Sequence, residues 1–556
     1  MRAMADTPSG PQLQAAPGAR LSSSRQWPGD WEPTGLEVHE ANQSPENTFR
    51  ERFKIALLQS QDGQECFRRE PFTQFDISQT ADSNGDGPNL LVSPPSPDQV
   101  YTYPMSMLSD VPTIPDTDEV ARLQSAFFTS FKQHIFIDAI AIPDSTLASP
   151  APYLQLALAC LAAEIAPYTD PMGYNLGAEV SHKTEVSSAL FYAGLNLWVV
   201  VMEVDNRETR RLEAVITAYL FATHAILSTH KENWRISCGL VHNTATLARR
   251  LRLTDGFSQP NSSGESIDRS LIMKSSLMAY MFLTDIVHAI YCDAAPTYST
   301  SEICIKMPSS NHSFRTVYRA LLHGHSRLPD DVKSREDCLL LLTALLNDII
   351  YLHRCNPHTP SPSPSPSLER ITGSDTVPDQ QKPFRNPYIP LSARSEFSRM
   401  SAQIRTALQR WLDHFGRVAE KDILALYHFA HLCLVCPGIT ELPSLAGYDP
   451  GLQFTPIPPG KMKQFQMSDK ALDLAWLVLD SSDMQSEPTP RRLSIWLPMV
   501  LFFSALVIWQ RLRHRSSNDF KYGTLKVLSM FKNEILQLPW PCCPSMAITL
   551  DRLMKE

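Results

Sequence analysis

Apolar residues recur every three or four positions through most of the chain after about residue 118. The clearest case is Arg211 to Ser228, whose bulky apolar residues follow the spacing of an amphipathic helix. No alternating strand pattern of useful length accompanies this spacing, so the sequence predicts an all-α fold, a large helical bundle. The predicted helices cover residues 118–131, 153–166, 185–204, 211–228, 234–253, 275–288, 314–327, 336–354, 397–415, 420–436, 468–480, 494–514 and 520–538.

The first 120 residues lack this spacing. They are rich in Pro, Ser, Gln, Gly and Asp, which predicts a disordered, low-complexity N-terminal region. Within it, Leu108 to Leu123 alternates acidic and apolar residues, a pattern found in activation segments and also in plain solvated linkers.

A second break separates two helical parts. Residues 356–390 include alternating Ser and Pro from Ser361 to Pro366, which cannot form the interior of a helix. We expect a Ser/Pro-rich linker there, either a spacer or a target of proline-directed kinases. The chain therefore divides into 1–120, a first helical part over 121–355, the linker, and a second part of the same domain over 391–556.

Composition narrows the function classes. The 556 residues are 43% apolar, enough for a sizeable core, and the net charge is −8. A wide basic face for nucleic acid is therefore not expected, and DNA contact must come from a local patch or a partner. Eleven cysteines lie scattered in apolar stretches, and the first thirty residues are polar, as in reduced proteins of the cytosol or nucleus.

Sequence motifs for catalysis are missing. The chain contains no G-x-G-x-x-G, G-x-x-x-x-G-K-[ST], G-x-S-x-G or H-E-x-x-H pattern. Asp285 and Asp293 are too isolated to form the aspartate-rich cluster of an all-helical metal enzyme. We therefore predict that the protein is not an enzyme and that this chain holds no catalytic residue, metal or cofactor.

One cluster has the residue types of a metal site. His428, His431, Cys433 and Cys436 would fan over about 200° of a helix surface, so they cannot converge on one zinc ion. We expect buried cysteines and packed histidines. Cys542 and Cys543 are interpreted as packing residues of a terminal turn, with a free reactive thiol as the weaker alternative.

Two further features have competing interpretations. The uncharged run Leu493 to Gln510 reaches the length of a membrane span, but Pro498 and equal positive flanks favour a buried core helix. The basic clusters Arg249–Arg252 and Arg511–Arg515 could serve nuclear import or phosphate contact, but positive charge that complements the helix dipole at helix ends is the favoured explanation.

Several segments, in order, resemble the fungal-specific transcription factor domain, the middle homology region of zinc-cluster regulators. They are FKQHIFIDAIAIP (131–143), YLQLALACLAAEI (153–165), ALF (189–191) and LW (197–198) with EVDNRE (203–208), Trp234 with ATLARRLRL (245–253), YSTSE through MP (298–308), LALYHFAHLCLVC (424–436) and the end from Phe531 to Leu553. Each piece is weak, whereas the order and spacing over 130–556 are moderately specific.

The resemblance implies a transcription regulator of the nucleus, acting at RNA polymerase II promoters and specific to one pathway, for example a secondary-metabolite gene cluster. Its expected partners are promoter DNA, reached directly or through a DNA-binding partner, a second subunit, and a small-molecule effector, with no membrane. It leaves the DNA-binding residues of this chain unknown.

The resemblance is incomplete in one respect. The family's DNA reader is an N-terminal zinc module, and this chain has only Cys66 and His39 before residue 131. Zinc is therefore expected only in a module upstream of this sequence. A shortened gene model, a regulator that acts through a partner and a lost reader are the open explanations.

The alternatives are an all-helical enzyme and a protein anchored in a membrane by residues 493–510. Under the regulator interpretation, the residues to watch are Glu203, Asp205, Asn206, Arg207 and Glu208, where closely spaced charges predict helix caps and ion pairs. Arg207→Ala is then expected to lower thermal stability.

Overall fold

The computed structural model describes residues 112, 114–130, 151–165, 176–204, 209, 211–255, 269–324, 327–355, 393–448, 468–482, 493–514 and 518–555. Helices dominate these residues, which contain a single isolated β-bridge, Lys306 with Ser313, and no strand. The predicted all-α fold is confirmed. The helices are α2 (Thr117–Ser130), α3 (Pro152–Ile165), α4 (Leu176–Val204), α5 (Leu212–Ile226), α6 (Lys231–Arg250), η9 (Leu253–Asp255), α7 (Arg269–Tyr291), α8 (Phe314–His323), α9 (Arg335–Cys355), α10 (Ala393–Phe415), α11 (Lys421–Val435), η10 (Ile439–Glu441), α12 (Leu442–Leu445), α13 (Asp469–Ser482), α14 (Leu497–His514), α15 (Asn518–Leu536) and α16 (Cys542–Lys555).

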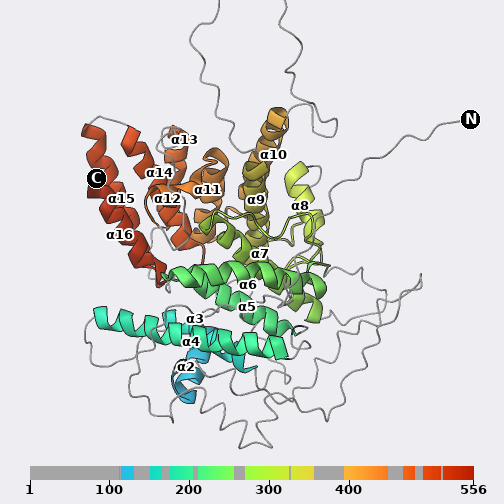
Figure 1. The fold of residues 1–556 in the computed structure, drawn as a ribbon. Helices are drawn as coiled ribbons and strands as arrows, with labels where there is room; N and C mark the ends of the chain where they lie inside the picture. The colour runs from blue at the N-terminus through green and yellow to red at the C-terminus, as the bar shows by residue number, and fades with distance from the viewer. Residues whose placement is uncertain are drawn as a thin grey trace, which may run out of the picture.

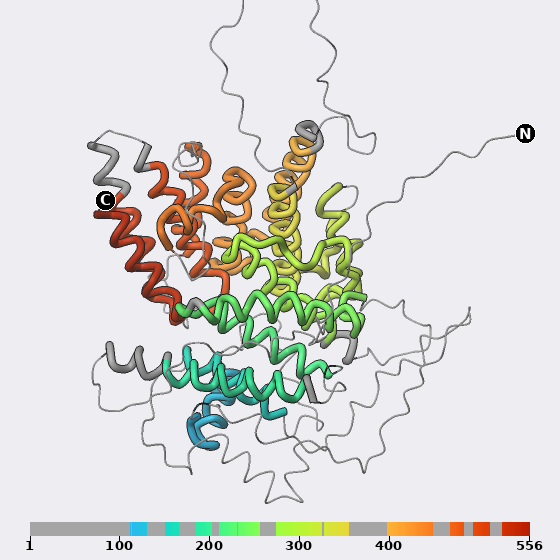
Figure 2. Tube along the Cα trace, in the orientation of Figure 1, coloured from blue at the N-terminus to red at the C-terminus, as the bar shows by residue number. Residues whose placement is uncertain are grey.

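The helices pack mainly on their neighbours in the chain. Helices α2 to α6 lie crosswise at one end of the molecule, and α8 to α16 stand side by side above them (Figures 1 and 2). The C-terminal hairpin returns to the first layer, because the Cys542 amide donates to the Leu227 carbonyl at 2.9 Å. The beginning of α16 is thereby fixed to the turn between α5 and α6.

The core is continuous across both layers. Every residue of α5 is buried, and α3 is nearly as enclosed, because helices on several sides cover them. Gly194 of α4 lets this layer close, since a Cβ there would lie 2.5 Å from the Phe221 ring and 2.9 Å from the Leu156 Cβ. A larger residue at this position would push α4 away from α3 and α5.

The two helical parts on either side of residues 356–392 pack against each other. Arg335 at the start of α9 donates to both carboxylate oxygens of Asp422 on α11, at 3.2 and 2.7 Å. The same carboxylate accepts a 2.5 Å bond from Ser494, ahead of α14. Trp411 of α10 adds a 2.9 Å bond to the Cys338 carbonyl. Buried, paired polar groups therefore join α9, α10, α11 and the segment before α14.

Most predicted helix positions agree with the structure to within a few residues, but the C-terminus does not. The sequence predicted a terminal turn at Cys542 and Cys543, whereas these residues begin the fourteen-residue helix α16. Pro544 favours a turn by sequence alone, yet a proline is tolerated in the first turn of a helix because the amide there has no partner within the helix. Both cysteines are fully buried, so their packing role agrees with the prediction.

The acidic and apolar segment from Leu108 to Leu123 also differs from both of its interpretations. The part that the structure describes begins without regular secondary structure and enters α2, and Ile114, Val120 and Leu123 are buried in the core. Asp116 caps the helix by accepting from the Glu119 amide at 2.8 Å. These apolar residues are core residues, because α2 packs on α3.

The run Leu493 to Gln510 lies inside the molecule. Residues 494–510 are all buried, as the core interpretation predicted. Within the described ranges, the window Glu185–Met202 of α4 is apolar and long enough to cross a membrane, and α11 with η10 and α12 would count as a second if taken as one broken span. More than half of the α4 window is buried, as in a core helix.

Candidate functional site

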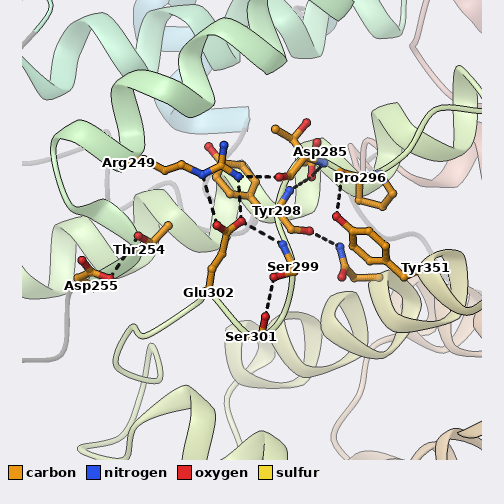
Figure 3. Close-up of polar contacts among 12 residues, drawn as sticks. Arg249, Thr254, Asp255, Asp285, Pro296, Tyr298, Ser299, Ser301, Glu302 and Tyr351 are labelled. Carbon is orange, nitrogen blue, oxygen red and sulfur yellow. Dashed lines mark hydrogen bonds and ion pairs between the residues drawn. The ribbon is translucent and has the colours of Figure 1, made fainter. Parts of the chain in front are cut away.

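Helices α6 and α7 carry the two polar clusters of greatest interest. The first surrounds Asp285, which is fully buried on α7 (Figure 3). Its Oδ2 accepts the backbone amides of Thr297 at 2.8 Å and Tyr298 at 3.0 Å. Burial raises the pKa of Asp285, and these two hydrogen bonds oppose that rise. The carboxylate thus holds the segment after α7 against the helix.

Arg249, in the last turn of α6, fastens the same segment from the other side. Its guanidinium bonds Glu302 at 3.0 Å and the Thr297 carbonyl at 2.7 Å, and its Cζ lies 5.3 Å from the centre of the Tyr298 ring. Figure 3 shows the Arg249 guanidinium beside the Tyr298 ring, with the Glu302 carboxylate below it. Glu302 in turn accepts from the Ser299 amide at 3.0 Å. Charge, hydrogen bonding and a cation–π contact therefore act together here.

The inner side of this segment is also paired. Tyr298 is buried, and its hydroxyl lies 3.0 Å from that of Tyr219 on α5. Two residues of α9 complete the contacts: Asn347 donates to the Tyr298 carbonyl at 2.9 Å, and Tyr351 donates to the Pro296 carbonyl at 2.7 Å. The segment 294–302 is consequently a joint between α5, α6, α7 and α9.

The second cluster consists of Cys238 on α6 with His288 and Cys292 on α7. One metal-ligating atom from each lies within 4.8 Å of the other two, and His288 Nε2 is 3.3 Å from Cys238 Sγ. The Cys292 amide bonds the His288 carbonyl at 2.9 Å, so Cys292 continues the helical register of α7. His288 and Cys292 therefore project from the same side of α7.

This cluster opens to solvent on the α6 side. His288 and Cys292 are buried, Cys238 is half-buried and His242 is exposed. His242 lies one turn after Cys238, with Nδ1 2.7 Å from the Cys238 carbonyl and its ring 5.8 Å from that of His288. Two pairs of ligand-type residues, each four positions apart, thus face each other from neighbouring helices.

The two thiols differ in acidity. The hydrogen bond from Cys292 and then the bond and charge of His288 lower the pKa of Cys238 to about 4, against the opposing effect of burial. The hydrogen bond to Cys238, together with burial, raises the pKa of Cys292. Cys238 is therefore the thiolate of the pair and Cys292 keeps its proton. A thiolate beside a histidine can bind a metal ion or react as a nucleophile.

A third cluster has the residue types of a catalytic triad without its geometry. Ser187 Oγ lies 3.4 Å from His224 Nδ1, and Glu164 Oε1 lies 3.9 Å from the same nitrogen. A triad needs the nucleophile and the orienting carboxylate on opposite ring nitrogens of the histidine base, whereas Ser187 and Glu164 lie on the same nitrogen. Burial, and after it the charge of His230, lower the pKa of His224 to about 3. A neutral, enclosed histidine is a packing group, and this geometry gives the enzyme alternative no support.

The residues first considered as a metal cluster remain apart from these sites. Cys433 and Cys436 are buried, and burial raises the pKa of both thiols, to about 12 for Cys436. His431 Nε2 contacts the Tyr427 hydroxyl at 3.0 Å, and burial lowers the pKa of this histidine to about 4. Their surroundings are those of packed side chains.

Other sequence predictions are located more simply. Arg249 and Arg250 end α6 and Arg511 lies near the end of α14, where it bonds Asp469 at 2.5 Å. The side chain of Glu203, and all of Asp205, Asn206, Arg207 and Glu208, lie outside the described residues, as do residues 1–111, His39, Cys66 and residues 356–392.

The sequence reasoning missed the Cys238 cluster. Its signal is Cys-x-x-x-His at 238–242 and His-x-x-x-Cys at 288–292, each pair one helical turn apart. Neither pair alone indicates a site, and only the packing of α6 on α7 brings them together.

Comparison with protein-family models, with curated proteins and with solved structures finds no match for the chain.

Proposed function

We propose that this protein is a transcription regulator of the fungal-specific type, acting in the nucleus on the promoters of one pathway. The observation that supports the proposal is the joint built on Arg249. It connects ATLARRLRL (245–253) with the segment that begins at Tyr298, two of the segments on which the resemblance rests. Such a joint gives these segments a structural reason to occur together.

In this proposal the helical body is a relay between promoter-bound protein and an effector or second subunit. The net charge of −8 favours contact with promoter DNA through a partner or a separate basic module over contact through the body itself. Ile114, Val120 and Leu123 are buried, so these three residues cannot belong to an exposed activation segment.

The test is chromatin immunoprecipitation of the full chain tagged at its own locus, with transcript levels measured in the same cells. Discrete promoter peaks, and altered transcripts of the adjoining genes on deletion, are the expected result. Protein that is expressed but stays outside the nucleus, without promoter enrichment, would remove the proposal.

A matched pair of variants sharpens the experiment. Arg249→Ala breaks the joint, and Arg250→Ala changes the same basic cluster at an exposed position. If the joint matters for regulation, Arg249→Ala alone reduces the transcript response at an unchanged nuclear level of protein. Nuclear exclusion of both variants would instead assign the basic cluster to import.

A further inference from the structure

We infer that Cys238, His242, His288 and Cys292 form a structural zinc site that staples α6 to α7. This inference is independent of the proposed function, since a zinc staple can occur in a protein of any activity. It also revises the expectation, made from sequence, that the chain itself holds no metal. The argument rests on the positions of the four side chains.

The distances suit a shared ion. Zinc bonds sulfur at about 2.3 Å and imidazole nitrogen at about 2.0 Å, which places two ligands of a tetrahedral ion about 3.5 Å apart. The observed separation of His288 Nε2 from Cys238 Sγ is 3.3 Å, and Cys292 Sγ lies within 4.8 Å of Cys238 Sγ and of a ring nitrogen of His288. Small rotations of these side chains would bring three ligands to one ion.

His242 is the natural fourth ligand. Its Nδ1 is 2.7 Å from the Cys238 carbonyl, an acceptor that holds the proton on Nδ1 and leaves Nε2 free for a metal. The rings of His242 and His288 are 5.8 Å apart, centre to centre. The exposed His242 ring can leave its bond to the Cys238 carbonyl and rotate to bring its Nε2 toward the other three ligands. The complete set is two thiolates and two imidazoles, the donor set of closed structural zinc sites.

A second observation points to a bound ion. His288 Nδ1 is buried and has no hydrogen-bond partner among the described residues, and the same is true of Oδ1 of Asp285, three positions earlier on α7. Residues three apart are neighbours on a helix surface. A zinc-bound histidine donates a hydrogen bond from its outer nitrogen, often to a carboxylate. Metal binding at Nε2 would therefore place a proton on Nδ1, on the side of α7 that carries the unpaired Asp285 oxygen.

The test uses the full chain, purified with reduced thiols and loaded with zinc sulfate. We expect about one tightly held zinc ion per chain by elemental analysis, in keeping with one four-ligand site. Cys238→Ser and Cys292→Ser lose the ion, while Cys304→Ser, a half-buried cysteine outside the cluster, retains it. Zinc-free protein, or equal zinc in Cys238→Ser and Cys304→Ser, overturns the inference.

Two measurements on the unmodified sequence guard against variants that fail to fold. Cobalt in place of zinc should give the intense visible absorption of a tetrahedral, thiolate-bound ion. Zinc should slow alkylation of Cys238 and Cys292 about tenfold or more, without effect on Cys304. A Cys238–Cys292 disulfide found by peptide mapping in freshly prepared protein, with no zinc bound, would identify a redox pair and overturn the zinc site.

Discussion

Two polar clusters occupy the same pair of helices, and they differ in what their side chains bind. Around Arg249 and Asp285, both charged groups bind several partners each from the segment after α7. Around Cys238, a thiolate faces a histidine whose second nitrogen has no partner in the described part of the chain. Charged groups that bind the backbone of a neighbouring segment are typical of a structural joint, whereas soft ligands gathered from two helices are typical of a site that takes a metal ion.

The largest expected effect is at the centre of the joint. Asp285→Ala leaves two backbone amides without an acceptor in the core and should lower the free energy of unfolding by about 3 kcal/mol, measured by urea denaturation. Asp285→Asn keeps one acceptor and should cost less. The control is Asp255→Ala, an exposed aspartate near the same joint. A loss similar to that of the control would contradict a structural joint.

His224 shows what burial does when no strong partner compensates. Burial lowers the pKa of His224 to about 3. As the pH falls below about 6.5, the histidine is therefore protonated in the unfolded chain and stays neutral in the folded chain. Between pH 7 and pH 5 the wild type should lose about 2 kcal/mol of stability relative to His224→Gln. The exposed His312→Gln is the control. Parallel stability curves for wild type and His224→Gln would show that the imidazole is not excluded from protonation.

The smallest effect belongs to the exposed side of the joint. The Arg249 and Glu302 side chains are 42% and 31% exposed, so solvent screens their attraction. With the bond to the Thr297 carbonyl and the Tyr298 contact included, Arg249→Ala should cost about 1 kcal/mol in thermal unfolding. Arg250→Ala should cost nothing measurable. If added salt removes the stability difference between the two variants, the charge attraction accounts for most of the effect of Arg249. If the difference persists in salt, the hydrogen bond and the ring contact account for it.

The effect of zinc on stability also distinguishes the metal site from the structural joint. Zinc should raise the melting temperature of the wild type and leave Cys238→Ser unchanged, because the ion binds the folded state alone. Asp285→Asn should lower stability with and without zinc. A zinc effect that survives the loss of Cys238 would place the ion elsewhere in the chain.

The sequence by itself determined the helices and much of the core. The three- and four-residue spacing of apolar side chains located α2, α3, α5 and α14, because a helix must bury its apolar face and the spacing of that face is local. It failed at α16, where prolines beside Cys542 and Cys543 suggested a turn. Tertiary packing outweighs the local turn propensity at this position, because α16 packs against α14 and α15.

Only the tertiary structure decided which polar residues meet. Cys238 and His288 are fifty positions apart, and Arg249 and Glu302 fifty-three, and no local pattern links such residues. The cluster that the sequence offered, His428 to Cys436, is local, and its members spread around one helix. Convergent polar sites need side chains from several elements, so their existence depends on how α6 and α7 pack, which spacing along the chain does not encode.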